Sequence, residues 1–167
     1  AATIRHGEFP PHRPEKTKQI PFRLENVASG LTGPGRWFLD SAAGRLFIIP
    51  PEGADADALE VVVPGPTELL VIEGNGDREK PVSHLTVRGI SFRHTRLPGG
   101  SSGFDGPGAA VRIDEATDCL IESCRFERLG SSAIRAGASV VRTTLRNCVI
   151  SDTAGGGIIV RGKVGVP

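Results

Sequence analysis

Apolar residues recur at fixed offsets in three stretches of the chain. Each stretch has an apolar residue at its first, third, sixth and eighth positions, and Thr143 is the only polar exception. The stretches are Leu85–Phe92, Cys119–Phe126 and Thr143–Ile150. Such a period is typical of a solenoid, because each coil buries its apolar edge only against the next coil.

The spacing between the stretches gives the size of a coil. Phe126 and Ile150 are 24 residues apart, whereas Phe92 and Phe126 are 34 apart. The first coil therefore carries an insertion, which the alignment places at 96–108. Apolar residues two apart, bounded by Gly, Asn, Asp and Ser, indicate short strands, and the leucine ladder of a leucine-rich repeat is missing. We predict an all-β fold: a right-handed parallel β-helix preceded by a β-hairpin segment.

The pattern also predicts three regions along the chain. Residues 1–20 are polar and proline-rich, which predicts an irregular arm. Residues 21–65 predict a hairpin and strand segment packed on the solenoid. The coils follow at 66–167, with the inserted loop 96–108 among them.

Within the segment before the coils, local patterns predict individual strands. The runs Trp37–Asp40 and Arg45–Pro50 flank the four-residue stretch Ser41–Gly44, a pattern typical of a hairpin. The apolar runs 59–63 and 69–72 predict strands that lead into the first coil. No window has a sustained helical period.

Composition narrows the range of partners. The net charge of +1 gives no reason to expect a nucleic-acid partner, and no apolar run is long enough to cross a bilayer. The 167 residues include no methionine and stop after an apolar strand, which predicts a fragment of a longer protein. A solenoid that ends there would need further coils or a partner chain to cap its C-terminal end.

The three cysteines do not make a disulfide framework, because their number is odd. Cys124 and Cys148 fall in one inward column with Ile90, where a thiol acts as a small apolar side chain. A disulfide between neighbouring coils remains open. No histidines stand at ligand spacing, so we predict no metal site and no cofactor.

Stacking the coils at steps of 34 and 24 residues aligns outward polar residues in columns. Neighbouring strands lie about 4.8 Å apart, so unlike charges in one column can pair. Two columns place a carboxylate between basic groups, as an ion-pair ladder should, and a third does not. The columns are His84, Asp118 and Arg142; Arg88, Glu122 and Arg146; and His94, Arg128 and Asp152.

The third column has the surroundings of a binding site. It lies at the base of the 96–108 insertion, and insertions in solenoids often build the binding face. Asp152 and Asp105 are the candidate carboxylate pair for acid–base chemistry on a bound ligand. His94 would orient hydroxyl groups of that ligand, and Arg128 would hold an acidic group. For both aspartates the alternative of an ordinary turn residue remains open.

Two further features allow both a functional and a structural interpretation. The acidic corner formed by Asp114, Glu115 and Asp118 suits calcium, although a solvated turn explains it as well. Trp37 would offer a flat aromatic surface to a ligand if it is exposed, whereas a packed hairpin would bury it.

Four segments resemble bacterial right-handed parallel β-helix proteins related to carbohydrate-active enzymes, including β-helical glycoside hydrolases. They are Phe22–Val27, Gly35–Asp40, Gly44–Gly53 and Leu85–Thr95, and the resemblance extends over about residues 20–162. It implies a carbohydrate or polysaccharide partner and a secreted or periplasmic location. Fold alone does not identify a sugar.

Three functions remain in view at this point. The first is hydrolysis of glycosidic bonds in a polysaccharide by a carboxylate pair. The second is a non-catalytic glycan-binding or structural module, in which the polar columns act only as ladders. The third is a polysaccharide lyase, which needs a base and a cationic group beside a uronic acid.

Overall fold

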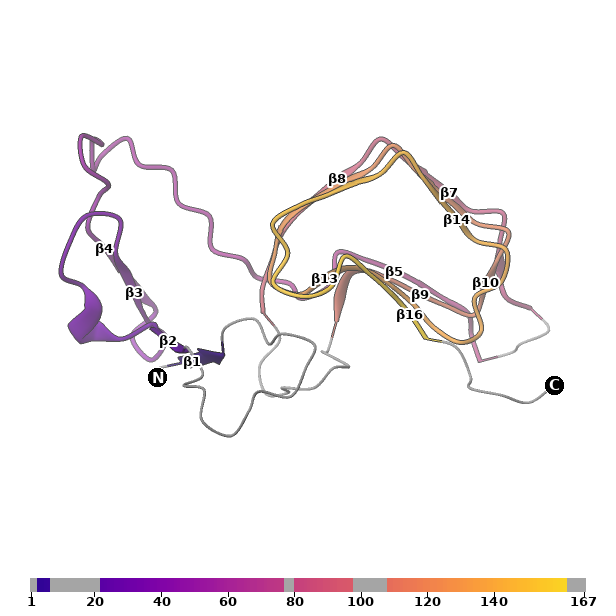
Figure 1. Cartoon of the computed structure of the whole chain (residues 1–167), viewed down its shortest axis with the longest axis horizontal. Helices are drawn as coiled ribbons and strands as arrows, with labels where there is room; N and C mark the ends of the chain where they lie inside the picture. Colours follow the sequence, from indigo (N-terminus) through magenta and orange to yellow (C-terminus); the bar gives the residue numbers. More distant parts are fainter. Residues whose placement is uncertain (1–2, 7–21, 77–79, 98–107, 162–167) are drawn as a thin grey trace, which may run out of the picture. The chain divides into compact units, whose positions relative to one another are not determined.

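The computed structural model describes residues 3–6, 22–76, 80–97 and 108–161 (Figure 1). The chain divides into two compact units, Ala1–Val61 and Val62–Pro167. Each unit is described by itself.

The described residues of the first unit form two antiparallel strand pairs and one short 3-10 helix. β3 pairs with β4, and the register Trp37↔Ile48 to Asp40↔Arg45 confirms the predicted hairpin. Asp40 holds the turn, since its carboxylate accepts hydrogen bonds from the backbone N–H groups of Ala42 and Ala43, each at 3.1 Å. The elements are β1 (Thr3–His6), β2 (Phe22–Glu25), η1 (Ala28–Gly30), β3 (Trp37–Asp40) and β4 (Arg45–Ile48).

Two segments of this region differ from the sequence prediction. Thr3–His6, in the part predicted to be irregular, form β1 because β2 supplies an antiparallel partner for their backbone. The predicted strand at 59–63 does not form. Val61, Val62 and Val63 are 44%, 50% and 60% exposed, and no described strand lies alongside to bond their backbone groups.

The second unit is a parallel β-helix. Its described strands form four sheets by in-register pairing between successive coils, in the orders β16-β13-β9-β5, β14-β11-β7, β15-β12-β8 and β10-β6. Figure 1 shows the coils superposed around one cross-section. The strands are β5 (Leu70–Glu73), β6 (Val82–Ser83), β7 (Thr86–Arg88), β8 (Ser91–Thr95), β9 (Ala109–Asp114), β10 (Ala116–Thr117), β11 (Leu120–Glu122), β12 (Arg125–Leu129), β13 (Ser132–Ala136), β14 (Thr144–Arg146), β15 (Val149–Ile150) and β16 (Ile158–Val160).

The corners of the coils have left-handed backbone, and they recur every five residues. In the middle coil Asp118, Ser123 and Arg128 have φ angles of 52°, 53° and 55°. Their counterparts one coil away do the same, with φ between 49° and 70°: His84, Gly89 and His94 before them, and Arg142, Asn147 and Asp152 after them. Single left-handed residues turn the chain sharply between short strands, which explains why the first and third residues after a corner face inward.

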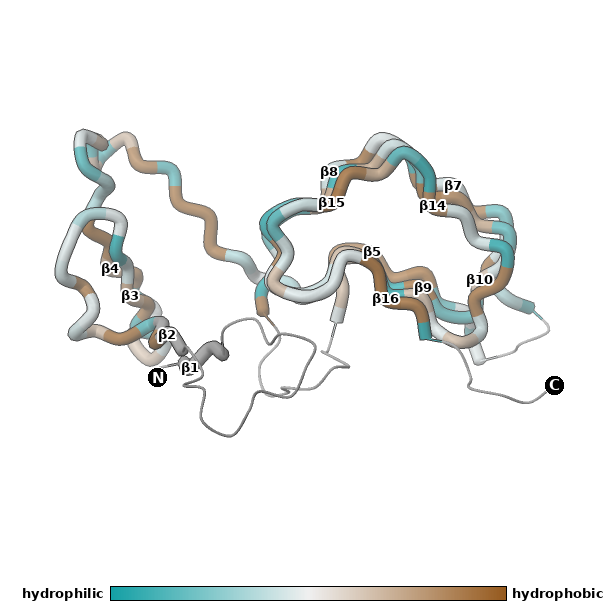
Figure 2. The backbone as a smooth tube through the Cα atoms, viewed as in Figure 1, coloured by the Kyte–Doolittle hydropathy of each residue, from teal (hydrophilic) through white to brown (hydrophobic). Residues whose placement is uncertain are grey.

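The inward columns build a continuous apolar core. Phe92 stacks on Phe126 with ring centroids 5.0 Å apart, and Phe126 is completely buried. Val111 and Ile134 stack in the same way and are also completely buried, while Ile158 above them in the last described coil is 48% exposed. Figure 2 shows apolar segments in brown along β5 and β16.

Gly130 allows the chain at the base of the insertion to cross the second coil. A Cβ atom at this position would lie 2.3 Å from the Leu97 nitrogen and 2.5 Å from the Arg96 carbonyl carbon. The Gly130 N–H donates to the Thr95 carbonyl at 3.0 Å, which fixes this close approach.

We predict that Gly130→Ala lowers the free energy of unfolding by about 2 kcal/mol or more, because backbone atoms must move to admit the methyl group. Urea denaturation measures the change. Gly157→Ala is the matched control, since its Cβ would meet no atom closer than 3.8 Å. Equal stability of the two variants would contradict the close packing described here.

Candidate functional site

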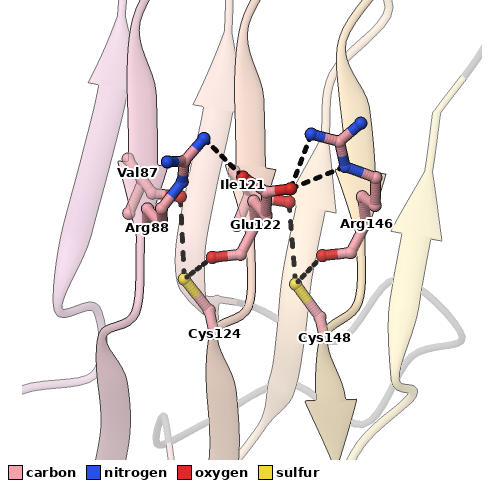
Figure 3. A network of polar contacts seen from close by, with 7 residues as sticks. All are labelled: Val87, Arg88, Ile121, Glu122, Cys124, Arg146 and Cys148. Carbon is pink, nitrogen blue, oxygen red and sulfur yellow. Dashed lines mark hydrogen bonds and ion pairs between the residues drawn. The ribbon is translucent and has the colours of Figure 1, made fainter.

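The predicted ladder of Arg88, Glu122 and Arg146 forms on the sheet β14-β11-β7 (Figure 3). Glu122 accepts from Arg88 Nη2 at 2.6 Å on one side and from Arg146 Nε at 2.7 Å on the other. The Glu122 side chain is only 12% exposed. Arg146, followed by Arg88, therefore lowers the pKa of Glu122 below its usual value. The Glu122 carboxylate is therefore occupied by ion pairs with Arg88 and Arg146.

Beneath the ladder, two thiols bond to backbone carbonyls (Figure 3). The Cys124 thiol faces the Glu122 carbonyl at 3.3 Å and the Val87 carbonyl of the preceding coil at 3.7 Å. Cys148 repeats the arrangement with Arg146 and Ile121. All three cysteines are free, and Cys124 is buried, so the stacked thiols belong to the core.

The predicted ladder of His84, Asp118 and Arg142 has its ion pair between the second and third coils. Arg142 donates from Nε and Nη2 to the two carboxylate oxygens of Asp118, each at 2.7 Å. This bidentate contact lowers the pKa of Asp118 from 3.8 to about 2. His84 adds a smaller favourable contribution from the other side.

Two further ion-pair groups were not predicted from the sequence. Arg112 contacts Glu73 at 2.9 Å, Asp114 at 2.8 Å and Glu68 at 3.3 Å. Glu73 is 39 residues before Arg112, a separation that neither repeat step reveals. In contrast, Arg93 pairs with Glu127 in register, so the 34-residue step contained that signal.

These contacts remove the calcium interpretation of the acidic corner. Asp114 bonds to Arg112, Asp118 bonds to Arg142, and Glu115 accepts from the Gly76 N–H at 2.8 Å. The three carboxylates therefore have different partners. Within the described residues, no group of three or more His, Cys, Asp or Glu side chains is arranged to hold a metal ion.

The third column is stacked but has no internal pairing. His94 and Arg128 occupy equivalent corners because Arg93↔Glu127 and Thr95↔Leu129 flank them in register. Asp152 follows one coil later, beside the bridge Leu129↔Thr153. Asp152 and Arg128 are exposed and His94 is half-buried. Among the described residues, no hydrogen bond or ion pair joins these three side chains.

Asp152 differs from the other carboxylates of the solenoid. In the described part of this unit, every other carboxylate accepts a hydrogen bond or forms an ion pair. These are Glu68, Glu73, Asp114, Glu115, Asp118, Glu122 and Glu127. Asp152 alone has neither contact. Its carboxylate also lacks the hydrogen bonds to backbone N–H groups that would be expected of an aspartate that stabilises a turn. Its carboxylate is therefore available to a ligand.

The remaining predicted site residues lie elsewhere. Asp105 falls outside the described residues. Trp37 belongs to the first unit, on β3, and is 52% exposed rather than buried. An exposed indole keeps the stacking interpretation open.

Comparison with known proteins agrees with this architecture. The chain is a parallel β-helix with stacked outward columns, and the right-handed β-helix region matches residues 74–166. That match covers more than half of the chain, so the protein belongs to the right-handed β-helix family. Searches of curated proteins and of solved structures found no match. In the part of the chain that is described, no helix has the length and hydrophobicity to span a membrane.

We predict that Arg142→Gln raises the pKa of Asp118 from about 2 toward 3.8, because the bidentate donor is lost. A carboxylate whose pKa is lowered by folding stabilises the native state above about pH 4 and loses that contribution as the pH falls through its native pKa. The acid-unfolding midpoint of Arg142→Gln should therefore move to higher pH. NMR titration of the Asp118 carboxyl and circular dichroism measure the two effects. Arg125→Gln, which removes an exposed arginine with no described partner, should change neither.

Proposed function

We propose that this protein is a carbohydrate-active β-helix protein that hydrolyses glycosidic bonds of a polysaccharide with a carboxylate pair. Asp152 and Asp105 are the proposed pair. By the same proposal, the protein is bacterial and acts in a secreted or periplasmic setting, where polysaccharides are met.

One observation carries this proposal. Asp152 is the only described carboxylate of the solenoid without a partner, and it stands at an exposed corner. A carboxylate that an arginine neutralises, such as Asp118, cannot easily give or take a proton near neutral pH. Asp152 forms no ion pair, so among the described carboxylates of the solenoid it is the one whose oxygens are free to contact a substrate.

The reaction requires two carboxyl groups with different tasks. One protonates the leaving glycosidic oxygen, and the other attacks the sugar or activates water. Their separation is about 5 Å in retaining enzymes and about 6.5–9.5 Å in inverting ones. Arg96 and Leu97, at the described base of the insertion, pass Gly130 next to the third column. Asp105 lies outside the described residues, so its partnership with Asp152 is proposed from the sequence alone.

His94 and Arg128 are the proposed substrate-binding residues beside Asp152. Strand spacing of about 4.8 Å puts Arg128 one step from Asp152 and His94 two steps away. A sugar chain lying along the solenoid axis would meet all three side chains in turn. The imidazole would bond to hydroxyl groups, and the guanidinium would donate several hydrogen bonds from a fixed plane.

We predict that Asp152→Asn lowers the turnover of a polysaccharide substrate by at least about 100-fold, because general acid–base catalysis contributes on this order. The fold should be unchanged, since Asn accepts left-handed backbone as readily as Asp. Reducing-end release from glycans measures turnover, and Asp57→Asn is the control at an exposed carboxylate in the first unit. Unchanged turnover would remove Asp152 from the mechanism. Products with an unsaturated sugar end would instead identify a lyase.

A non-catalytic glycan-binding module is the second candidate. It is favoured by the same distribution of charges, since only one described carboxylate of the solenoid has no partner and hydrolysis needs two carboxyl groups. The exposed Trp37 also favours it, because an indole face stacks on a sugar ring without chemistry.

We predict that Trp37→Ala weakens glycan binding by about threefold to tenfold, as the loss of one aromatic contact would. Thermal stability should change little, because half of the side chain is already exposed. Affinity electrophoresis measures the binding. Leu24→Ala removes an apolar side chain of similar exposure, 53%, and should leave binding unchanged. Equal affinity for both variants would exclude Trp37 from the binding surface.

A further inference from the structure

The exposed arginines in the described part of the solenoid fall into two groups. Arg88, Arg93, Arg142 and Arg146 each form an ion pair with a carboxylate. Arg96, Arg125 and Arg128 form none with any described residue, and all three are exposed. Arg96 directly follows β8, and Arg125 and Arg128 lie on β12, the strand that pairs with β8.

The columns explain why these arginines are unpaired. Arg125 stands between Ser91 and Val149, so the neighbouring coils offer it no carboxylate. Arg96 follows Thr95 and is level with Gly130, which has no side chain. The only carboxylate next to Arg128 in its column is Asp152, and the two form no ion pair.

The unpaired arginines surround the proposed catalytic column. Along β12, a rise of about 3.3 Å per residue separates Arg125 from Arg128 by about 10 Å. Asp152 is one coil beyond Arg128, and His94 is one coil before it. The described acidic groups of this face are Glu127, which Arg93 occupies, and Asp152. The face therefore presents more free positive than free negative charge.

We propose that the polysaccharide bound at this column is anionic, and that Arg125 and Arg128 hold its acidic groups. The inference rests on the proposed function, and it specifies the class of substrate. A guanidinium donates two parallel hydrogen bonds to a carboxylate or a sulfate, so a uronic acid and a sulfated sugar share the required chemistry. Residues repeating along a glycan would place acidic groups at intervals along the same face.

Binding to three glycans tests this inference: polygalacturonate, a sulfated galactan and neutral xylan. The intact chain and its Arg125→Gln and Arg128→Gln variants are compared by isothermal titration calorimetry at low and high salt. We expect an anionic glycan to bind at least tenfold more tightly than xylan, and the preference to shrink as salt screens the charges. Each variant should lose about 10-fold to 100-fold in affinity for the anionic glycan only, as the loss of a charge-assisted contact does.

Arg36→Gln is the matched control, because Arg36 is an exposed arginine of the first unit. Tighter binding of polygalacturonate than of the sulfated galactan identifies a uronate ligand, and the reverse identifies a sulfate ester. Equal binding of xylan and the anionic glycans, unaffected by Arg125→Gln or Arg128→Gln, would overturn the inference and leave the proposed function standing. Failure of every glycan to bind would overturn both.

Discussion

The solenoid depends on in-register parallel pairing between successive coils. Backbone N–H groups of one coil bond to carbonyls of its neighbour, as Leu120 N–H does to Leu85 O at 2.9 Å and Thr144 N–H does to Cys119 O at 2.8 Å. This pairing stacks each side chain on its counterpart about 4.8 Å away. Like side chains can then share a core column, as Phe92 and Phe126 do. Like charges cannot share an outward column without cost, which explains why Glu122 separates two arginines.

In-register pairing stacks residues one repeat apart, so much of the fold of the solenoid could be predicted from the spacing of residues in the sequence. The 24-residue step aligned Glu122 with Arg146 and Phe126 with Ile150, and the structure pairs both. The hairpin was also predictable, because the runs Trp37–Asp40 and Arg45–Pro50 flank the four-residue stretch Ser41–Gly44. The sequence prediction was wrong at 59–63, since an apolar β-branched run becomes a strand only where another strand supplies backbone partners.

The ion-pair groups show where the repeat ceases to be informative. Arg112 lies opposite Val71 in the register, a step of 41 residues, because the first coil contains the insertion and further loop residues. No fixed period leads from Arg112 to Glu68 and Glu73, so this cluster needed coordinates. The third column was predictable as a column but not as an unpaired one. The lack of ion pairing depends on side-chain geometry at Asp152 and Arg128, which spacing does not specify.

The left-handed corners bear on the role that we propose for Arg128. A corner favours Gly, Asn or Asp, and Gly89, Asn147 and Asp152 meet that preference. Arg142 does not, but its bidentate bond with Asp118 stabilises it there. Arg128 has the same left-handed backbone, with φ of 55°. It is not one of the residue types that favour a corner, and no ion pair within the described fold stabilises it there. A long side chain on such backbone, without a compensating contact within the fold, fits the ligand contact that we propose for it. An anionic ligand at this corner would supply that contact, and it would lie one coil from the free carboxylate of Asp152.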